Sequence, residues 1–232
     1  MTRQGIIFDV DGTLVDTNPS HVEAWRRAFE RFGQHVPVGR IEAEIGKGGD
    51  KLVPAILGDD IERRQGEALR KAQKEEFLAI AERERFRIFP GVPSIFSALR
   101  ERKIRTALAT SSDDKHLRAT FASAGLDLTK LVDVVATKSA ASASKPDPDI
   151  IEAAVERLKL QPFECAMVGD TVFDGHACQG AGVVFLGVLS GGTPANELVG
   201  AGAIGVWQDI AHLLGELDQA LLLAAHAGAA IK

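Results

Sequence analysis

The chain has 232 residues, 45% of them hydrophobic and 25% charged, and a formal net charge of −5. This composition is ordinary for a globular protein with a sizeable core, and the negative charge gives no electrostatic reason to expect nucleic acid. No apolar run could span a bilayer, no signal-peptide layout opens the chain, and two cysteines are too few for a disulfide framework or a zinc cluster. We therefore expect a soluble, cytoplasmic protein without a membrane partner, and a monomer by default.

The first predicted element is a short apolar strand at residues 6–8, which leads into Asp9, Asp11 and then Gly12. Residues i and i+2 of an extended segment point the same way, so both acids can face one site. Neighbouring carboxylates repel unless a cation or a proton offsets their charge, and Mg²⁺ takes oxygen ligands beside phosphate. A plain acidic turn after a strand is the alternative.

Helical sequence follows this strand. Residues 18–19 predict a helix start, with a cap residue before a proline, and residues 46–49 form a glycine-rich bend. Charged residues dominate a thin apolar set between residues 60 and 85, which suits an outlying helical bundle. The turn at residues 89–91 ends this region. We predict a helical insertion, or cap domain, at residues 16–90.

Strands and helices alternate from residue 92 onward. Strands are predicted at 105–110, 132–136, 166–168, 182–188 and 203–207, with helices between them and a closing helix at 210–223. Such alternation is typical of a parallel sheet covered by helices on both faces. The expected fold is α/β: a doubly wound core domain formed by residues 1–15 and 91–232, interrupted by the insertion. Ligands of such sheets bind outside the carboxyl ends of the strands.

Polar side chains gather at the predicted strand ends. Thr110 and Ser111 offer hydroxyls that suit a phosphate oxygen, with a plain helix cap as an equal alternative. Lys145 in its loop can supply a fixed positive charge to a phosphoryl group, although a single loop lysine is usually only solvated. Asp170 and Asp174 add two acids after a buried strand. Together with the first motif, this set predicts a metal-assisted phosphoryl-transfer site.

Four ordered segments resemble the motifs of the haloacid dehalogenase superfamily. They are residues 9–13, 110–111, 145–146 and 169–171 followed by Asp174. The place of the insertion is similar to that in the class with a helical C1 cap on a Rossmann-like core. Residues 14–17 and 89–92 also resemble the phosphoglycolate phosphatase and beta-phosphoglucomutase branch, so the resemblance covers the whole chain.

The resemblance implies a catalytic role for five of these residues. Asp9 would be the nucleophile that forms an aspartyl-phosphate, and Asp11 would be the acid and base for the leaving oxygen and the attacking water. Thr110 and Ser111 would hold the phosphoryl oxygens. Lys145 would neutralise them together with the nucleophile.

The resemblance also implies a Mg²⁺ site. The Asp9 carboxylate, the Asp11 backbone carbonyl and Asp170 would bind the ion, with Asp174 close by. Dehalogenases lack an acid at the position of Asp11, and phosphonate-cleaving relatives differ there, so this residue favours phosphate-ester chemistry.

Substrate choice is expected to lie in the cap. His21 resembles a histidine that mutase-like members place near the acid/base aspartate, and an exposed first-turn histidine is the alternative. Lys47 belongs to a loop expected to face the core site, where it can meet an anion. Mutases have an arginine in this loop that holds a second phosphate, and Gly49 stands in its place. This departure favours a phosphatase.

The sequence thus predicts a Mg²⁺-dependent phosphatase that acts on a small phosphorylated metabolite, a sugar phosphate or phosphoglycolate. A sugar phosphomutase and a catalytically silent phosphate-binding protein are the alternatives. Two histidines, His116 and His176, are expected at the surface or at helix ends, and Cys165 is expected in the core.

Overall fold

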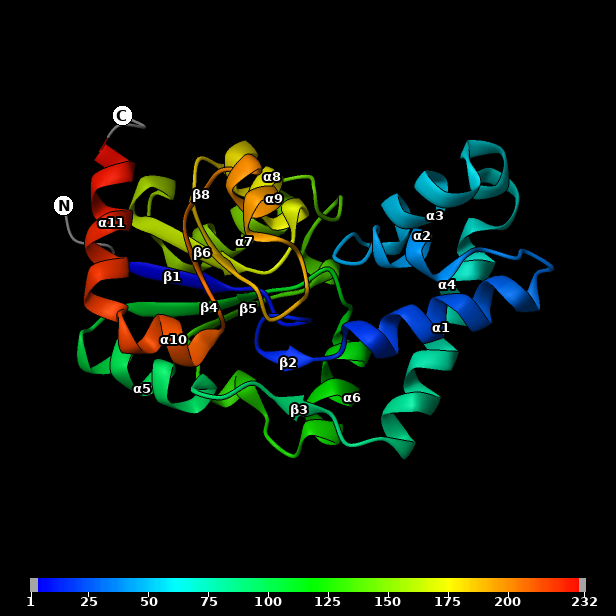
Figure 1. Ribbon diagram of the computed structural model, residues 1–232, viewed down its shortest axis with the longest axis horizontal. Coiled ribbons are helices and arrows are strands. Elements are labelled where there is room, and N and C mark those ends of the chain that lie inside the picture. Colours follow the sequence, from blue (N-terminus) through cyan, green and yellow to red (C-terminus); the bar gives the residue numbers. More distant parts are fainter. Residues whose placement is uncertain (1–3, 230–232) are drawn as a thin grey trace.

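The computed structural model describes residues 4–229, which form a central sheet and a separate group of helices (Figure 1). The sheet has six strands in the order β5-β4-β1-β6-β7-β8, and every neighbouring pair is parallel. Its strands are β1 (Gly5–Phe8), β4 (Arg105–Ala109), β5 (Val134–Ala136), β6 (Cys165–Gly169), β7 (Val184–Val188) and β8 (Ala203–Trp207). The predicted doubly wound α/β core is confirmed.

Each face of the sheet packs against its own layer of helices, because successive strand residues point to opposite faces. On one face Phe8 meets Phe96, with ring centroids 5.1 Å apart, while Ile7 belongs to the core on the other face. The first layer contains α5 (Val92–Glu101), α6 (Asp114–Ala124), α10 (Ile210–Gly215) and α11 (Leu217–Ala229). The second contains α7 (Asp149–Leu158), α8 (Val172–Ala181) and α9 (Ala195–Gly200). Single 3₁₀ turns lie at η1 (Leu128–Lys130), η2 (Lys138–Ala140) and η3 (Pro162–Glu164).

The remaining helices lie beyond the carboxyl ends of the strands (Figure 1). They are α1 (Asn18–Arg31), α2 (Val38–Glu42), α3 (Gly49–Leu57) and α4 (Asp59–Arg83). Trp25, Phe29 and Leu69 belong to a third hydrophobic cluster, which these helices make among themselves. Phe77 and Ile80 of α4 instead join the core of the sheet layer. The helical group is therefore packed onto the sheet at one end, and the exact division into two domains stays a prediction.

Two features differ from the sequence prediction. A two-stranded antiparallel ribbon, β2 (Val15–Asp16) and β3 (Arg87–Ile88), connects the helical group to the core. Strands of two residues are too short to show a periodic pattern, so the ribbon was not predicted. The predicted closing helix is two helices, which meet at Glu216; its carboxylate accepts a hydrogen bond from the Trp207 indole at 3.0 Å. Among residues 4–229, none of the helices has both the length and the apolar character needed to cross a membrane.

Candidate active site

A cavity of about 550 Å³ lies between the carboxyl edge of the sheet and the helical group. Asp9 and Thr110 line it from the ends of neighbouring parallel strands, as the topology requires. His21 of α1 and Gln73 of α4 line it from the opposite side. Most of the predicted site residues of the core and of the cap therefore line one space, whereas Lys145, Asp170 and Asp174 are buried and are not among its lining residues.

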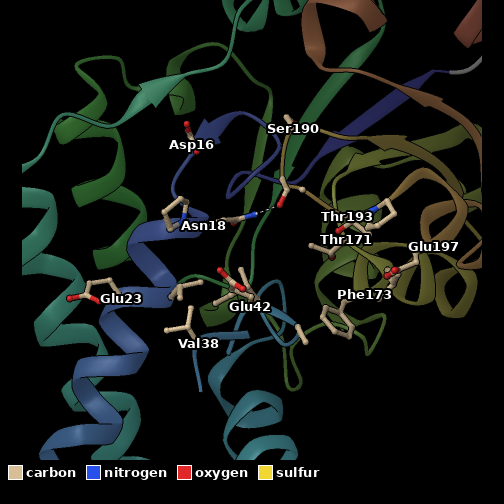
Figure 2. Close-up of a pocket in the computed structure, with 18 of the residues that line it drawn as sticks. Asp16, Asn18, Glu23, Val38, Glu42, Thr171, Phe173, Ser190, Thr193 and Glu197 are labelled. Atoms are coloured by element: carbon tan, nitrogen blue, oxygen red, sulfur yellow. Dashed lines mark hydrogen bonds between the residues drawn. The ribbon is translucent and has the colours of Figure 1, made fainter. Parts of the chain in front are cut away.

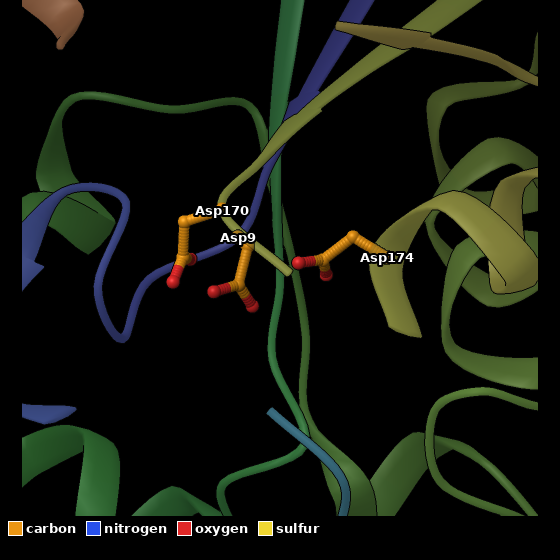
Figure 3. A group of neighbouring side chains, drawn as sticks. All are labelled: Asp9, Asp170 and Asp174. Carbon is orange, nitrogen blue, oxygen red and sulfur yellow. The ribbon is translucent and has the colours of Figure 1, made fainter. Parts of the chain in front are cut away.

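Three buried carboxylates form the centre of this site. One carboxylate oxygen from each of Asp9, Asp170 and Asp174 could bind a metal, and these oxygens all lie within 4.8 Å of one another (Figure 3). The first two follow the adjacent strands β1 and β6, and the Asp9 amide donates to the Val168 carbonyl at 2.9 Å. Asp174 stands on the first turn of α8, where its carboxylate accepts hydrogen bonds from the Thr171 amide at 3.0 Å and hydroxyl at 2.7 Å. This capping box fixes the third acid.

Lys145 is buried among these acids. Its Nζ lies 2.5 Å from Asp9 Oδ1 and 2.7 Å from Asp174 Oδ1, and it donates to the Ala109 carbonyl at 3.0 Å. Its side chain is only 1% exposed. Burial alone would lower the pKa of this ammonium, but the charges of Asp174 and Asp9 raise it, so the lysine stays charged. The alternative of a solvated loop lysine is excluded.

The cluster carries more negative charge than Lys145 can neutralise, with three carboxylates against one ammonium. Burial raises the pKa of Asp9 well above its ordinary value, although Lys145 opposes the shift. Burial and the Asp174 charge raise the pKa of Asp170 to about 7. Two acids with elevated pKa values indicate a site that is electrostatically incomplete without a further cation.

The surroundings of Asp170 fit a hard divalent cation. Its carboxylate accepts hydrogen bonds from the Thr13 hydroxyl at 2.6 Å and the Asn18 amide at 3.2 Å, which fix its orientation. A Cβ atom at Gly12 would lie 2.3 Å from Asp170 Oδ2, and one at Gly191 would lie 1.6 Å from it. The space beside this carboxylate thus exists because both neighbours are glycines. Buried carboxylate oxygens are the donors that Mg²⁺ prefers.

Asp11 points away from the carboxylate cluster. Its Oδ1 accepts from the Thr17 hydroxyl at 2.7 Å and lies 3.1 Å from His21 Nε2, while Oδ2 accepts from Ser112 at 3.0 Å and from Thr110 at 3.3 Å. Burial opposes ionisation, but the His21 charge and these hydrogen bonds lower the pKa of Asp11 below its ordinary value. Its carboxylate is absent from the acid group that could hold a metal, so a role in metal binding rests on its backbone carbonyl and stays a prediction.

His21 is enclosed rather than exposed. Its side chain is 12% exposed and stacks on Phe77 with ring centroids 4.2 Å apart. The Gln73 amide lies 3.5 Å from Nδ1, opposite the Asp11 contact. The alternative of a free first-turn histidine is wrong, because α4 covers the ring.

The loop before α3 touches the core site through its backbone. The Ser111 hydroxyl donates to the Gly46 carbonyl at 3.5 Å, the outer limit of such a bond. Lys47 lines the cavity, but it pairs with Glu44 and lies 4.7 Å from the centre of the Phe173 ring. Its role in substrate binding stays a prediction.

Gly49 begins α3 and is covered by two side chains. A Cβ atom there would lie 2.9 Å from Arg70 Cγ and 3.0 Å from Trp25 Cζ2. The Arg70 side chain thus occupies the space beside the glycine. Direct contact between Gly49 and a substrate stays a prediction.

The sequence did not single out several residues that line the site. His116 was expected at the surface or at a helix end; it lies in the first turn of α6, but it is only 8% exposed and lines the cavity, so the expectation of a surface residue was wrong. It shares the buried face of α6 with Leu117, Thr120 and Phe121, and this helical spacing was the available signal. His176 is exposed and Cys165 buried, as expected.

A larger cavity, of about 720 Å³, lies on the other side of the α1 N-terminus (Figure 2). The Asn18 amide donates to the Gly191 carbonyl at its wall, at 3.3 Å. Asp16, Glu23, Glu42 and Glu197 also line it. Its lining lacks Asp9, Asp11 and Thr110, and its acidic side chains outnumber its one basic side chain, Arg26, which disfavours a phosphate. The smaller cavity is therefore the candidate active site.

Comparison with known proteins agrees with this assignment. A family described as haloacid dehalogenase-like hydrolase matches residues 4–182. The chain is 29% identical to a phosphoglycolate phosphatase of Nitrosospira multiformis over 77% of its own length and 80% of the relative's. It is 29% identical to a phosphorylated carbohydrates phosphatase of Thermotoga maritima over 87% of this chain and 92% of that one. The crystal structure of a hydrolase from Pseudomonas syringae superposes with a TM-score of 0.86 at 28% identity, covering 93% and 98% of the two chains.

The ordered motifs, the parallel sheet with its carboxylate edge and the family match over most of the chain agree with one another. The chain belongs to the haloacid dehalogenase-like hydrolases.

Proposed function

We propose that the protein is a Mg²⁺-dependent phosphatase that hydrolyses a small phosphomonoester through an aspartyl-phosphate on Asp9. The observation that carries the proposal is the buried group of Asp9, Asp170, Asp174 and Lys145, which has an excess of negative charge at the carboxyl edge of the sheet. An anionic nucleophile can approach an anionic phosphate only where cations offset the repulsion.

Each residue has a separate task in the first half of the reaction. Asp9 attacks phosphorus, and its carboxylate oxygen forms a bond as the ester oxygen leaves. Lys145 neutralises the phosphoryl oxygens, which Thr110 and Ser111 hold. Asp11, which must enter the reaction protonated although, despite burial, His21 lowers its pKa in the substrate-free protein, gives that proton to the leaving oxygen and becomes a carboxylate.

In the second half a water molecule attacks the aspartyl-phosphate. Asp11 takes the proton of that water, and the release of inorganic phosphate restores the carboxylate of Asp9. Four hydrogen-bonding neighbours hold Asp11 in place for both halves: Thr17, His21, Thr110 and Ser112. A Mg²⁺ ion bound to Asp9, Asp170 and the Asp11 carbonyl would supply further positive charge for the phosphoryl group.

A small metabolite suits the size of the site. A cavity of about 550 Å³ has room for a sugar phosphate, and the two named relatives are phosphatases for phosphoglycolate and for phosphorylated carbohydrates. We extend that class of substrate to this chain, which we take to act as a monomer.

Release of free phosphate from a panel of small phosphomonoesters, with and without Mg²⁺, tests the proposal. We expect metal-dependent release by the wild type and at least about a thousandfold loss in Asp9→Asn, since a neutral amide is not a nucleophile for phosphorus. Asp59→Asn, an exposed change at the start of α4, is the matched control.

Three other outcomes would contradict this function. Turnover by Asp9→Asn would exclude the mechanism. Interconversion of sugar phosphates that requires an activating bisphosphate, with little free phosphate, would indicate a mutase. A thermal shift with Mg²⁺ but no turnover of any ester would indicate a silent binding protein.

A further inference from the structure

We propose that the cavity selects phosphomonoesters whose carbon part is uncharged and hydroxylated, and that Asp50 determines this preference by neutralising Lys138. The inference rests on the proposed phosphatase function and states which class of phosphomonoester the enzyme prefers. It favours polyol and sugar monophosphates over phosphorylated carboxylic acids and bisphosphates.

The first observation is that the cavity offers no unpaired cation in its interior among the residues described. Five lysine and arginine side chains line it, and four of them form ion pairs. The pairs are Lys47–Glu44, Arg70–Glu62, Lys74–Asp113 and Lys138–Asp50. The fifth, Lys71, is exposed at the rim, one helical turn from Glu67 on α4. A second anionic group on the substrate would find no free positive charge inside.

Asp50 is the acid on which the charge balance of the cavity depends most. It stands on the first turn of α3, where its Oδ2 lies 3.2 Å from Lys138 Nζ and accepts from the Ser144 amide at 3.4 Å. Partial burial opposes ionisation, but the Ser144 hydrogen bond and the Lys138 charge lower the pKa of Asp50, so it is ionised at neutral pH. This acid from the cap thus reaches Ser144, the neighbour of Lys145, and pairs with Lys138 of the core.

Arg70 is withheld from a second phosphate in a similar way. Its Nη1 lies 2.7 and 2.8 Å from the two Glu62 oxygens, and its stem packs beside Gly49. The guanidinium would have to exchange a carboxylate that it already binds for an incoming anion. Such an exchange gains little, because one charged partner replaces another.

The second observation is that neutral polar side chains line the same cavity. Gln73, Ser111 and Ser112 are among its lining residues. Amide and hydroxyl groups both donate and accept hydrogen bonds, so they suit a substrate alcohol. The pocket thus provides partners for a hydroxylated carbon part.

Two matched pairs of esters test the inference with the full-length protein and Mg²⁺. Glycerol 1-phosphate and 3-phosphoglycerate differ by an alcohol against a carboxylate, and fructose 1-phosphate and fructose 1,6-bisphosphate differ by a second phosphate. We expect kcat/KM to be at least about tenfold higher for the uncharged member of each pair. In Asp50→Asn, Lys138 loses its partner. We expect the ratio of kcat/KM for the uncharged member to kcat/KM for the anionic member to fall at least about threefold, through a lower KM for the anionic member.

Asp147→Asn is the matched control, because Lys51–Asp147 also joins the cap to the core but lies outside the cavity lining. The ratio of kcat/KM between the two members of each pair should be the same in Asp147→Asn as in the wild type. Equal changes in both variants would show that Asp50 acts only through cap closure and would overturn its assigned role.

Preference for the anionic member of both pairs would overturn the selectivity while leaving the phosphatase intact. Absence of phosphate release from all four esters and from p-nitrophenyl phosphate would instead overturn the phosphatase proposal, and this inference with it.

Discussion

Lys145 supplies the positive charge that touches both Asp9 and Asp174. In Lys145→Met these buried carboxylates lose their ion pair, and we expect the metal-free protein to lose about 3 kcal/mol of unfolding free energy. The phosphoryl group also loses a fixed cation, so kcat/KM for phosphate release should fall at least about a hundredfold. Urea denaturation and phosphate-release kinetics measure the two effects.

Lys130→Met is the control for this change, because Lys130 is 79% exposed and its contact with Asp127 is 3.8 Å long. It should alter the unfolding free energy by less than about 0.5 kcal/mol. A Lys145→Met enzyme with normal turnover would contradict the assigned role of the lysine.

Among single residues, the sequence predicted those site residues that belong to a local motif. Asp9 and Asp170 follow apolar strands, so their convergence could be predicted from the sheet topology alone. Asp50 and His116 could not be predicted in this way, because their contacts cross between the helical group and the core. Such contacts depend on the angle at which helices pack, which no local pattern specifies.

At the scale of elements, Gly91 governs the return of the chain from the ribbon into α5. It has a φ of 83°, and a Cβ atom there would lie 2.8 Å from Ala211 Cα of α10. In Gly91→Ala both the backbone conformation and the contact with α10 are strained, and we expect a loss of about 1–3 kcal/mol of unfolding free energy. Thermal and urea denaturation measure this loss.

Gly200→Ala provides the comparison, because Gly200 ends α9 with nothing within 4 Å of its added Cβ. Its stability should be unchanged or raised by up to about 1 kcal/mol. If both variants were equally stable, the close approach of Gly91 to α10 would not constrain the fold. Kinetic constants of Gly91→Ala below its melting temperature should match the wild type, because the residue lies outside the cavity lining.

The sequence pattern predicted the long elements of the fold but not the shortest ones. All six strands of the parallel sheet were predicted, β5 among them, because parallel strands covered by helices are continuous apolar runs. The ribbon of β2 and β3 was not, although it determines where the helical group leaves the core. Its two-residue strands are stabilised by pairing with each other, which is a non-local interaction.

At the scale of the whole molecule, the excess negative charge couples folding to pH and to metal. The pKa of Asp170 is about 7 in the folded protein against an ordinary value of 3.8, and that of Asp9 is also raised, chiefly by burial. Between about pH 4 and about pH 7 the native state therefore binds more protons than the unfolded state. The unfolding free energy of the metal-free protein should therefore fall as the pH rises from about 4 to about 7.

A divalent cation should reverse this loss, because it binds the ionised carboxylates and competes with protons for them. We expect the rise in melting temperature caused by Mg²⁺ to be clearly larger at about pH 8 than at about pH 5. In Asp170→Asn both the pH dependence of the metal-free protein and the Mg²⁺ response should shrink, since the amide neither titrates nor attracts the ion as strongly. Asp59→Asn, far from the cluster, should keep both. An equal Mg²⁺ response at the two pH values would show that the ion binds elsewhere, and the carboxylate cluster would then owe its stability to shared protons.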